Sequence, residues 1–396
     1  MNLRVLPGKT KLLIFSILLF RMASFLSYPF LAVHLDKLGF NPIEIGLVIG
    51  IPYFFSGIGG IFAGNIADQL GQKKAMILAL LLGSVSFVCL GQSESMTSFL
   101  LFNLLILISS ILFEPAASSL IAASIPEELL TSAFRLRYIA INIGASIGPM
   151  IGGGFAYVGM NECFTITGVL FLLLGGAIFL IKNPVRSLKN EYSFTRLKST
   201  LKHMSNHAAF LQLTAANLFI SMTYCQMLST LPQVLNEKFA NSVELYSLLL
   251  TVNPITVVSF GFFMNKALGA LTTRTLFLTG CLVLFITFIG FHFSPPSYTA
   301  YILLMILFTL GEVILMPTTS RFIVDLSPNE HRGTYLGSES CYHLGFFIGN
   351  LLGGFLLQRG FSIFLFCSLC VIIAQLLFYR SCSAHRRDKH AAETRS

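Results

Sequence analysis

Twelve long apolar runs divide this sequence, and they constrain its fold more than any other feature. A helix needs about 20 apolar residues to cross the hydrocarbon core of a bilayer, and every run is near that length. The runs cover residues 12–35, 43–64, 75–92, 97–121, 134–158, 163–181, 208–234, 245–265, 275–293, 297–321, 333–357 and 361–379. Charged residues make up only 11% of the 396 residues, against about 25% in a typical soluble domain. The sequence therefore predicts an all-α membrane protein with twelve transmembrane helices.

The order of the runs predicts two bundles of six helices each. A polar, basic segment separates the sixth run from the seventh. The halves also repeat each other, because EPAASSLIAASIPEEL (114–129) aligns with MPTTSRFIVDLSPNEH (316–331), with two prolines at the same spacing in each. Such repeats recur in transporters, so we expect two pseudo-symmetric bundles. The predicted domains are an N-terminal bundle, a basic linker, a C-terminal bundle and a basic tail, at 1–181, 182–207, 208–380 and 381–396.

The placement of Lys and Arg predicts the orientation in the membrane. With a cytoplasmic N-terminus, all but four of the 26 basic residues fall in cytoplasmic segments, as the positive-inside rule requires. The exceptions are Lys37, Lys238 and Arg359 on the other side and Arg21 within a run. Both termini are therefore expected in the cytoplasm, and the net charge of +9 follows from topology and not from nucleic-acid binding. The short loops favour a multi-pass protein of a bacterial inner membrane.

One short polar stretch, GNIADQLGQKK (64–74), separates the second and third runs. It resembles the signature of the major facilitator superfamily at this place, G-x-L-A-D-R-x-G-R-K, although Gln69 and Gln72 stand where the signature has arginines. The matching positions are Gly64, Asp68, Gly71 and Lys73. With twelve runs and a basic central segment, the resemblance covers essentially the whole chain. It implies a monomeric transporter that works by alternating access, in which this loop is a gating latch of the outward-facing state. The alternative is a turn that only sets topology.

A second motif lies in the fifth run, GASIGPMIGG (144–153). It is similar to G-x-x-x-G-P-x-x-G-G, a signature associated with the drug/proton antiporter branch of the superfamily, and this similarity implies an exporter. The residues that match are Gly144, Gly148, Pro149, Gly152 and Gly153. Glycines four apart share one helix face and allow close packing, and a proline can bend the helix. Packing alone is the alternative interpretation, because the eleventh run carries similar glycines without the proline.

Ionisable residues inside the runs are functional candidates, since an unpaired charge is costly in a bilayer. Arg21 and Glu114 fall at comparable depth in the first and fourth runs, and in the superfamily these helices line the central cavity, so we expect the two to pair. Such a pair can couple transport to protons, because burial and a neighbouring arginine act oppositely on the proton affinity of a carboxyl. A permanent structural ion pair is the alternative. The proton-coupling candidates are Arg21, Glu114, Glu312, Glu339 and His343. Many proton-coupled drug exporters carry an arginine early in the fourth helix, and the run 97–121 has none.

Aromatic and amide side chains near the middle of the runs are candidates for the wall of a substrate cavity. They are Phe25, Tyr28, Tyr53, Phe113, Asn142, Tyr224, Gln226, Asn253 and Tyr342. The cysteines lie in or beside apolar runs, apart from Cys382 in the tail, and are interpreted as small buried hydrophobic residues. No metal site and no cofactor are expected.

These features predict a secondary transporter. Its substrate is expected to be a small, amphipathic compound, and the favoured interpretation is export coupled to protons. A proton symporter or facilitator that imports a nutrient, or a metal chelate such as a siderophore, fits the shared motifs nearly as well. An enzyme or a receptor is disfavoured, because the sequence has no nucleophile motif, no HExxH and no phosphate-binding Gly-rich loop. The expected partners are the substrate, protons and the lipid bilayer, with no nucleic acid.

Overall fold

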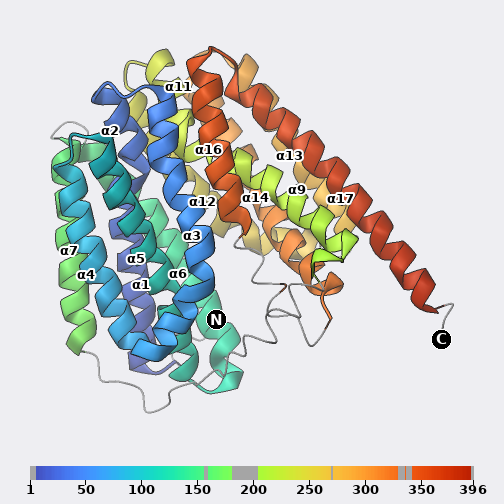
Figure 1. Cartoon of the computed structure of the whole chain (residues 1–396), viewed down its shortest axis with the longest axis horizontal. Coiled ribbons are helices and arrows are strands. Elements are labelled where there is room, and N and C mark those ends of the chain that lie inside the picture. The colour runs from blue at the N-terminus through green and yellow to red at the C-terminus, as the bar shows by residue number, and fades with distance from the viewer. Residues whose placement is uncertain are drawn as a thin grey trace.

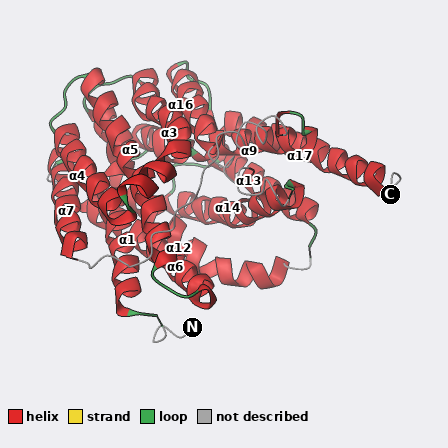
Figure 2. Cartoon of the chain, turned by 60° about the horizontal axis from the view of Figure 1, so that its bottom comes forward, coloured by secondary structure: helices red, strands yellow, loops and turns green. Residues whose placement is uncertain are grey.

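The protein is all-helical wherever its structure is described (Figure 2). The computed structural model describes residues 6–155, 159–180, 204–268, 271–328, 335 and 341–393, and no strand occurs among them. Nine of the described helices are long and apolar enough to cross a membrane. The helices that occupy the second, fifth and eleventh predicted runs complete a set of twelve. The predicted fold, two bundles of six transmembrane helices, is confirmed.

The N-terminal bundle contains the first six membrane-spanning segments. Its elements are α1 (Gly8–Ser27), the 3-10 turn η2 (Tyr28–Phe30), α2 (Leu31–Lys37), α3 (Pro42–Leu70), α4 (Gln72–Gly91), α5 (Met96–Ala123), α6 (Glu127–Gly154) and α7 (Met160–Leu180). Short sequence signals mark where these helices start, and α3 is an example. The Asn41 side chain accepts a hydrogen bond from the Glu44 amide, the Glu44 carboxylate accepts one from the Asn41 amide, and Pro42 follows as the first helical residue. This capping box satisfies amide groups that have no partner within the helix.

The C-terminal bundle contains the other six segments. Its elements are α9 (Ala208–Tyr224), α10 (Gln226–Ser229), α11 (Leu231–Lys238), α12 (Ser242–Leu268), α13 (Thr273–Phe293), α14 (Tyr298–Leu326), α16 (Tyr342–Gln358) and α17 (Ile363–Glu393). The predicted boundary between bundle and tail at residue 380 does not coincide with a helix end, because α17 continues to Glu393. The start of this extension is packed: Ser381 is buried and its hydroxyl donates to the Ala209 carbonyl at 2.5 Å.

The first and seventh segments are interrupted at equivalent places in the two halves. In the first, η2 joins α1 to α2 and contains Pro29; in the seventh, α9, α10 and α11 follow one another and Pro232 lies at the start of α11. A proline has no amide hydrogen and interrupts the helical hydrogen-bond ladder. The shared interruption supports the pseudo-symmetry that the sequence repeat predicts.

Most of the contact between the two bundles is made by two helix pairs, α3 with α16 and α6 with α12, and α2 also touches α11. Glycines bring the first pair into backbone contact, because a Cβ atom on Gly46 would lie 2.5 Å from the Asn350 carbonyl oxygen. In the second pair, the Ser247 hydroxyl donates to the Pro149 carbonyl at 2.5 Å. We call the side of the molecule with the N-terminal end of α1 and the C-terminal end of α17 the terminal side, and the other the far side. These contacts involve the far-side parts of the helices, and the bundles diverge towards the terminal side (Figure 1).

Candidate functional site

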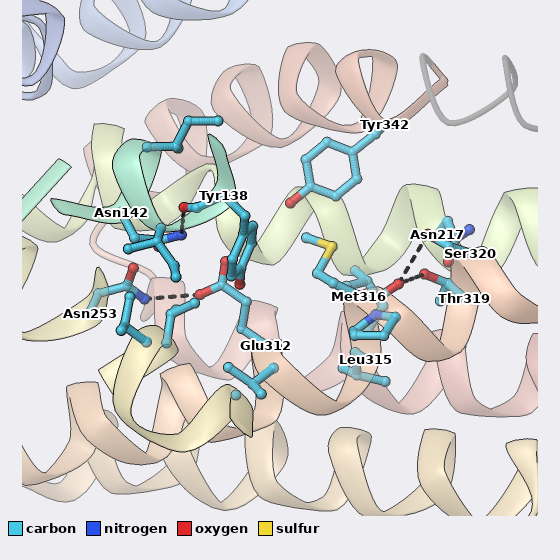
Figure 3. A pocket seen from close by; sticks show the side chains of 18 of the residues that line it. Tyr138, Asn142, Asn217, Asn253, Glu312, Leu315, Met316, Thr319, Ser320 and Tyr342 are labelled. Atoms are coloured by element: carbon cyan, nitrogen blue, oxygen red, sulfur yellow. Dashed lines mark hydrogen bonds between the residues drawn. The ribbon is translucent and has the colours of Figure 1, made fainter. Parts of the chain in front are cut away.

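A cavity of about 820 Å³ lies between the bundles in their terminal-side halves. The N-terminal bundle contributes one wall through α6, and the C-terminal bundle contributes the rest through α9, α12, α14 and the start of α16 (Figure 3). The polar or ionisable residues of the lining include Arg135, Tyr138, Asn142, Asn217, Asn253, Glu312, Tyr342 and His343. Isoleucine, valine, leucine and methionine side chains fill the spaces between them. An apolar wall with a few fixed polar groups is typical of a small-molecule site.

Glu312 is the acidic residue of the cavity lining. The Asn253 amide donates to its Oε2 at 2.9 Å and also donates to the Thr309 hydroxyl at 2.9 Å, which fixes the orientation of the amide. Within the described residues, Glu312 forms no ion pair with a lysine, arginine or histidine. A carboxyl group in an apolar environment is stable only when it carries a proton or binds a cation. Glu312 is therefore the candidate in this lining for binding a proton or a cation.

Aromatic rings form the wall of the cavity nearest the interface between the bundles. Tyr342 lines the cavity, and its ring centroid lies 5.0 Å from that of Phe346 and 6.2 Å from that of Tyr224. Tyr53 of α3 continues this cluster across the interface, with its centroid 4.8 Å from that of Phe346. The rings offer flat apolar surfaces to an amphipathic molecule.

His343 lies in the cavity lining and in the interface between the bundles. Its Nδ1 is 3.2 Å from the hydroxyl of Ser56 on α3, and its ring centroid is 5.9 Å from that of Tyr53. A residue that both faces the cavity and bonds to the other bundle can link cavity contents to the interface. Glu339, the neighbouring proton-coupling candidate, lies outside the described residues.

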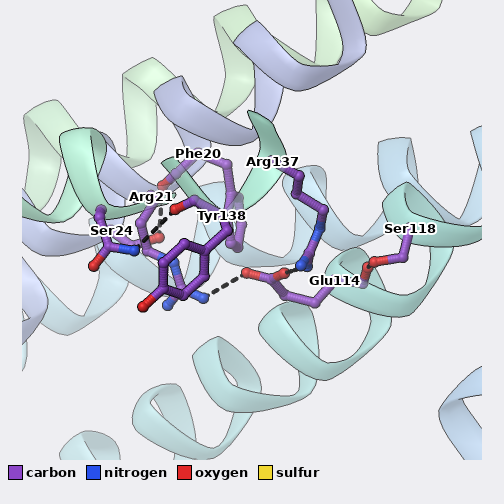
Figure 4. Close-up of polar contacts among 8 residues, drawn as sticks. Phe20, Arg21, Ser24, Glu114, Ser118, Arg137 and Tyr138 are labelled. Carbon is purple, nitrogen blue, oxygen red and sulfur yellow. Dashed lines mark hydrogen bonds and ion pairs between the residues drawn. The ribbon is translucent and has the colours of Figure 1, made fainter. Parts of the chain in front are cut away.

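Arg21 and Glu114 form an ion pair, and a second arginine joins them (Figure 4). The Arg21 Nη2 donates to Glu114 Oε1 at 2.6 Å, and the Arg137 Nη2 donates to Glu114 Oε2. The side chains of Arg21, Glu114 and Arg137 are 28%, 21% and 19% exposed. We call these three residues the arginine cluster. Tyr138, which lines the cavity, lies beside Arg21 in Figure 4.

The pairing of Arg137 with Glu114 is not predicted from the sequence. Arg135 and Arg137 open the fifth run, and their simplest interpretation is as anchors on the cytoplasmic side, with Arg137, Tyr138 and Asn142 at the floor of the cavity as the alternative. The helix instead begins at Glu127, so Arg137 lies about three turns inside it. Of that alternative, Tyr138 and Asn142 line the cavity, and Arg135 does so as well. Tyr138 and Arg135 are four and seven positions before Asn142 and therefore share a helix face with it.

Of the nine residues predicted for the cavity wall, Asn142, Asn253 and Tyr342 line it. Tyr53 and Tyr224 lie behind the lining in the aromatic cluster described above. The others make packing contacts: Phe25 lies under the Arg21 guanidinium of the same helix at 5.6 Å, and Phe113 of α5 stacks on Phe20 of α1 at 4.0 Å. Tyr28 is half-buried next to the interruption of the first segment. The fully buried Gln226 donates to the Gly349 carbonyl at 2.8 Å, so its amide joins α10 to α16.

The stretch 64–74 is more helical than the sequence predicts. α3 continues through Leu70, so Gly64 and Asp68 are helical residues and not part of a loop. The side chain of Asp68 lies outside the described part of the structure. The turn is made at Gly71, whose φ of 82° lies in the region that favours glycine. Lys73 then donates to the Phe179 carbonyl at 2.7 Å, near the end of α7.

The glycines of the fifth segment pack against two helices. Cβ atoms on Gly144 and Gly148 would lie 2.5 Å from the Leu18 carbonyl oxygen and 2.7 Å from the Met22 carbonyl oxygen, both on α1. A Cβ on Gly152 would overlap the Leu26 carbonyl oxygen, also on α1. Gly153 faces Ser247 on α12 instead. The motif therefore allows backbone contact with α1 within the N-terminal bundle and close approach of the Ser247 side chain from the other bundle.

The cysteines include one C-x-x-C spacing, Cys367 and Cys370, which the sequence analysis overlooks. Both side chains are buried in α17, and both thiols are free. Among the described residues, no group of His, Cys, Asp or Glu side chains has the arrangement of a metal site. The pair is consistent with packing residues in a helix.

Comparison with known proteins identifies relatives of the whole chain. A model of the Major Facilitator Superfamily matches residues 13–233 and 214–395. The chain is 24% identical to the quinolone resistance protein NorA of Staphylococcus aureus over 94% of this chain and 96% of that protein. It is 22% identical to a Na⁺, Li⁺, K⁺/H⁺ antiporter of Planococcus maritimus over 82% of this chain and 83% of that protein. Its fold matches a crystal structure of a mutant of the nucleoside transporter NupG with a TM-score of 0.77 at 15% identity, over 95% and 99% of the two chains.

Proposed function

This chain belongs to the major facilitator superfamily, and we propose that it is a secondary transporter that exports a small, amphipathic compound in exchange for protons. The carboxyl of Glu312 in the cavity, which has a hydrogen bond from Asn253 and no ion pair among the described residues, carries this proposal. Its proton passes to water in the cavity, and the carboxylate that remains binds the positively charged end of a substrate. Since one group cannot hold both at once, release of one cation accompanies binding of the other.

The apolar lining supports an amphipathic substrate. Ile139, Val257 and Met316 line the cavity together with Tyr342, and burial of an apolar body against them contributes roughly 25 cal/mol for each Å² removed from water. A compound that is charged at one end can place its apolar body here and its charge at Glu312. The two relatives have names that refer to quinolone resistance and to cation/proton antiport, and both names are compatible with this proposal.

We propose that both termini lie in the cytoplasm of a bacterial inner membrane. The cavity is then open to the cytoplasm and the bundles are closed on the outside, which is an inward-facing state. Alternating access would proceed by rotation of the bundles about the central cavity, with separation of α3 from α16 and of α6 from α12. In the opposite state, the stretch 64–74 would approach the other bundle and act as the gating latch.

Glu114 has a different role in this proposal. Its two carboxylate oxygens bind two arginines, so neither oxygen can bind another group unless an ion pair is broken. A carboxylate held in this way is a positioning residue, whereas Glu312 with an amide as its partner is free to bind and release a proton. We therefore propose Glu312, and not Glu114, as the proton carrier, with His343 as the next candidate.

Proton release from the purified protein tests this proposal. Ethidium, an amphipathic organic cation, is added to the protein in weakly buffered detergent solution, and the change in pH is followed with a dye. We expect about one proton per bound ethidium from the wild type and from Glu237→Gln, which changes an exposed residue on α11. Glu312→Gln should bind ethidium without releasing a proton. Equal proton release from Glu312→Gln and the wild type would contradict the proposal.

A transport measurement tests whether ethidium and protons move in opposite directions. Proteoliposomes with the protein in mixed orientation are loaded with ethidium-binding DNA, and ethidium entry is followed by fluorescence after a proton gradient is imposed. We expect entry to accelerate when the lumen is more acidic than the medium, because protons then leave as ethidium enters. No response to a gradient of either sign would show a facilitator without proton coupling.

A further inference from the structure

The arginine cluster carries more positive charge and more hydrogen-bond donors than Glu114 can satisfy. Two guanidinium groups share one carboxylate, so the cluster has a net charge of +1 when all three groups are ionised. Each guanidinium has five N–H donors. In the described part of the chain, Glu114 is the sole hydrogen-bond acceptor of Arg21 and of Arg137. Because the side chains are 28% and 19% exposed, the remaining charge is partly accessible from outside the cluster.

The cluster lies next to the cavity wall that the N-terminal bundle provides. Arg21 is beside Tyr138 in Figure 4, and Tyr138 lines the cavity together with Glu312 and is 52% exposed. Tyr138, the residue after Arg137 of the cluster, thus lies in the same cavity lining as Glu312 of the other bundle. Arg135, one turn before Tyr138 on α6, adds positive charge to the same wall.

The two walls of the cavity therefore differ in sign. The wall of the N-terminal bundle has Arg135, with the arginine cluster next to it, and the wall of the C-terminal bundle has Glu312 without a basic partner among the described residues. A monopolar cation would satisfy Glu312 and would leave the arginine cluster with unused charge. A molecule with an anionic group at one end and a cationic group at the other satisfies both walls.

We propose that the substrate of this cavity is a zwitterion with an apolar body, and this inference rests on the proposed role of the cavity as the transport site. Its anionic group accepts hydrogen bonds from Arg21 and Arg137 next to Glu114, and displaces water from their free N–H groups. Its cationic group binds the Glu312 carboxylate. The apolar body lies along Tyr138 and Tyr342. Charge-assisted hydrogen bonds are stronger than neutral ones, so the two ends set the specificity and the walls supply apolar burial.

Three matched probes test this inference by binding to the purified protein in nanodiscs. They are 4′-(aminomethyl)biphenyl-4-carboxylate, which is zwitterionic, 4′-methylbiphenyl-4-carboxylate, which has only the anionic group, and (4′-methylbiphenyl-4-yl)methylammonium, which has only the cationic one. Isothermal titration calorimetry gives each Kd. We expect the zwitterion to bind the wild type at least about ten-fold more tightly than either partner, because each end adds a charge-assisted hydrogen bond. Equal Kd values for the zwitterion and the cation would overturn the inference.

Substitutions assign each end to its wall. Arg137→Gln should weaken the binding of the zwitterion and of the anion about ten-fold or more and leave the Kd of the cation unchanged. Glu312→Gln should weaken the zwitterion and the cation and leave the anion unchanged. Arg274→Gln is the matched control, since Arg274 lies over the Tyr379 ring on the C-terminal bundle, outside the cavity lining, and should change none of the three. A uniform loss for all three probes in Arg137→Gln would show a structural role only and overturn the assignment.

Glu114→Gln should increase the affinity for the anionic probe, a result that a misfolded variant would not give. It releases both arginines from their carboxylate, so the anionic probe should bind about ten-fold more tightly than to the wild type. No gain for the anion would contradict an anion-binding role for the cluster. A failure of the proposed function gives a different result. If ethidium binding releases no proton while zwitterion binding depends on the arginines and on Glu312 as expected, the zwitterion site is supported and proton coupling is wrong. If ethidium is exchanged for protons and the affinity of the probes does not depend on the arginines, the proposed proton-coupled transport is supported and the inference of a zwitterionic substrate is wrong.

Discussion

The Asn236 amide donates a hydrogen bond to the Asp36 carboxylate at 2.8 Å, and the two residues belong to different bundles. Asp36 ends the first interrupted segment in α2, and Asn236 lies in α11 at the end of the seventh. The pseudo-symmetric partners thus meet on the far side of the molecule. Together with the Ser247–Pro149 contact, this bond closes the far side.

Asn236→Ala removes the donor of this bond. We expect the population that is open on the far side to rise about five-fold, because one hydrogen bond between partly exposed groups contributes about 1 kcal/mol. Double electron–electron resonance between spin labels at the exposed residues Glu94 and Phe361 measures the distance distribution. Asn161→Ala, an exposed amide on α7, is the control and should leave the distribution unchanged. An unchanged distribution in Asn236→Ala would mean that the bond does not contribute to closure.

Gly46→Ala should prevent the close contact of α3 with α16. The new Cβ would lie 2.5 Å from a backbone oxygen of Asn350, which cannot move as a flexible side chain would, and overpacking of this kind costs about 1–3 kcal/mol. The bundles would then separate on the far side and the cavity would close on the terminal side. Cys341 lines the cavity, so its alkylation by a maleimide should slow at least five-fold, roughly the effect of 1 kcal/mol, as measured by mass spectrometry.

The matched control for this prediction is Gly176→Ala. A Cβ at Gly176 in α7 meets no atom within 4 Å, so the variant should alkylate at the wild-type rate. Equal rates for Gly46→Ala and Gly176→Ala would show that the α3–α16 contact tolerates a methyl group and does not limit closure.

Glu114→Gln should destabilise the protein although it improves the proposed anion site. The substitution leaves two arginines close together without a counter-charge, and loss of one partner of a buried ion pair is strongly destabilising. The side chains here are about one-fifth to one-quarter exposed, so screening reduces the effect to about 1–2 kcal/mol. Thermal unfolding in detergent should show a lower Tm than for the wild type and for Glu237→Gln. The double variant Glu114→Gln with Arg137→Gln should recover part of the loss in Tm. If the effects of the two substitutions on Tm are strictly additive, Glu114 and Arg137 do not interact and the prediction is wrong.

Gly152→Ala should destabilise the N-terminal bundle more than Gly154→Ala. A Cβ at Gly152 overlaps the Leu26 carbonyl of α1, whereas a Cβ at Gly154 meets nothing within 4 Å. The expected difference in the free energy of unfolding is at least about 1 kcal/mol. Both variants place alanine near the end of one helix, so propensity differs little between them. Equal Tm values for the two would show that α1 and α6 can separate without cost.

Sequence patterns predicted the helices well because a bilayer imposes one simple requirement, about 20 apolar residues for each crossing. Helix ends were predicted less well. α3 and α17 extend past their apolar runs, because polar residues such as Gln69 continue a helix outside the bilayer core as easily as apolar ones. The break at Tyr28–Phe30 was not predicted, although Pro29 was the available signal.

The cavity was only partly predictable, because polarity does not tell which way a side chain points. Gln226 and Asn253 are both amides in the middle of a segment, yet Gln226 binds the Gly349 carbonyl in the packed interior and Asn253 faces the cavity beside Glu312. Glu114 and Glu312 looked equivalent in the sequence, and they differ through Arg137, which lies 23 positions from Glu114. Contacts between helices decide such cases, and no local pattern encodes them.

The glycines of the α3–α16 contact have a consequence for the speed of the transport cycle. Where Gly46 meets Asn350, backbone packs against backbone, so this part of the contact orders no rotamers when it forms and releases none when it breaks, and it adds little side-chain entropy to the activation barrier. A joint of interlocked leucines of the same area would resist sliding in both directions. We therefore expect the far-side gate to be quick, and turnover to be limited by the exchange of cations at Glu312.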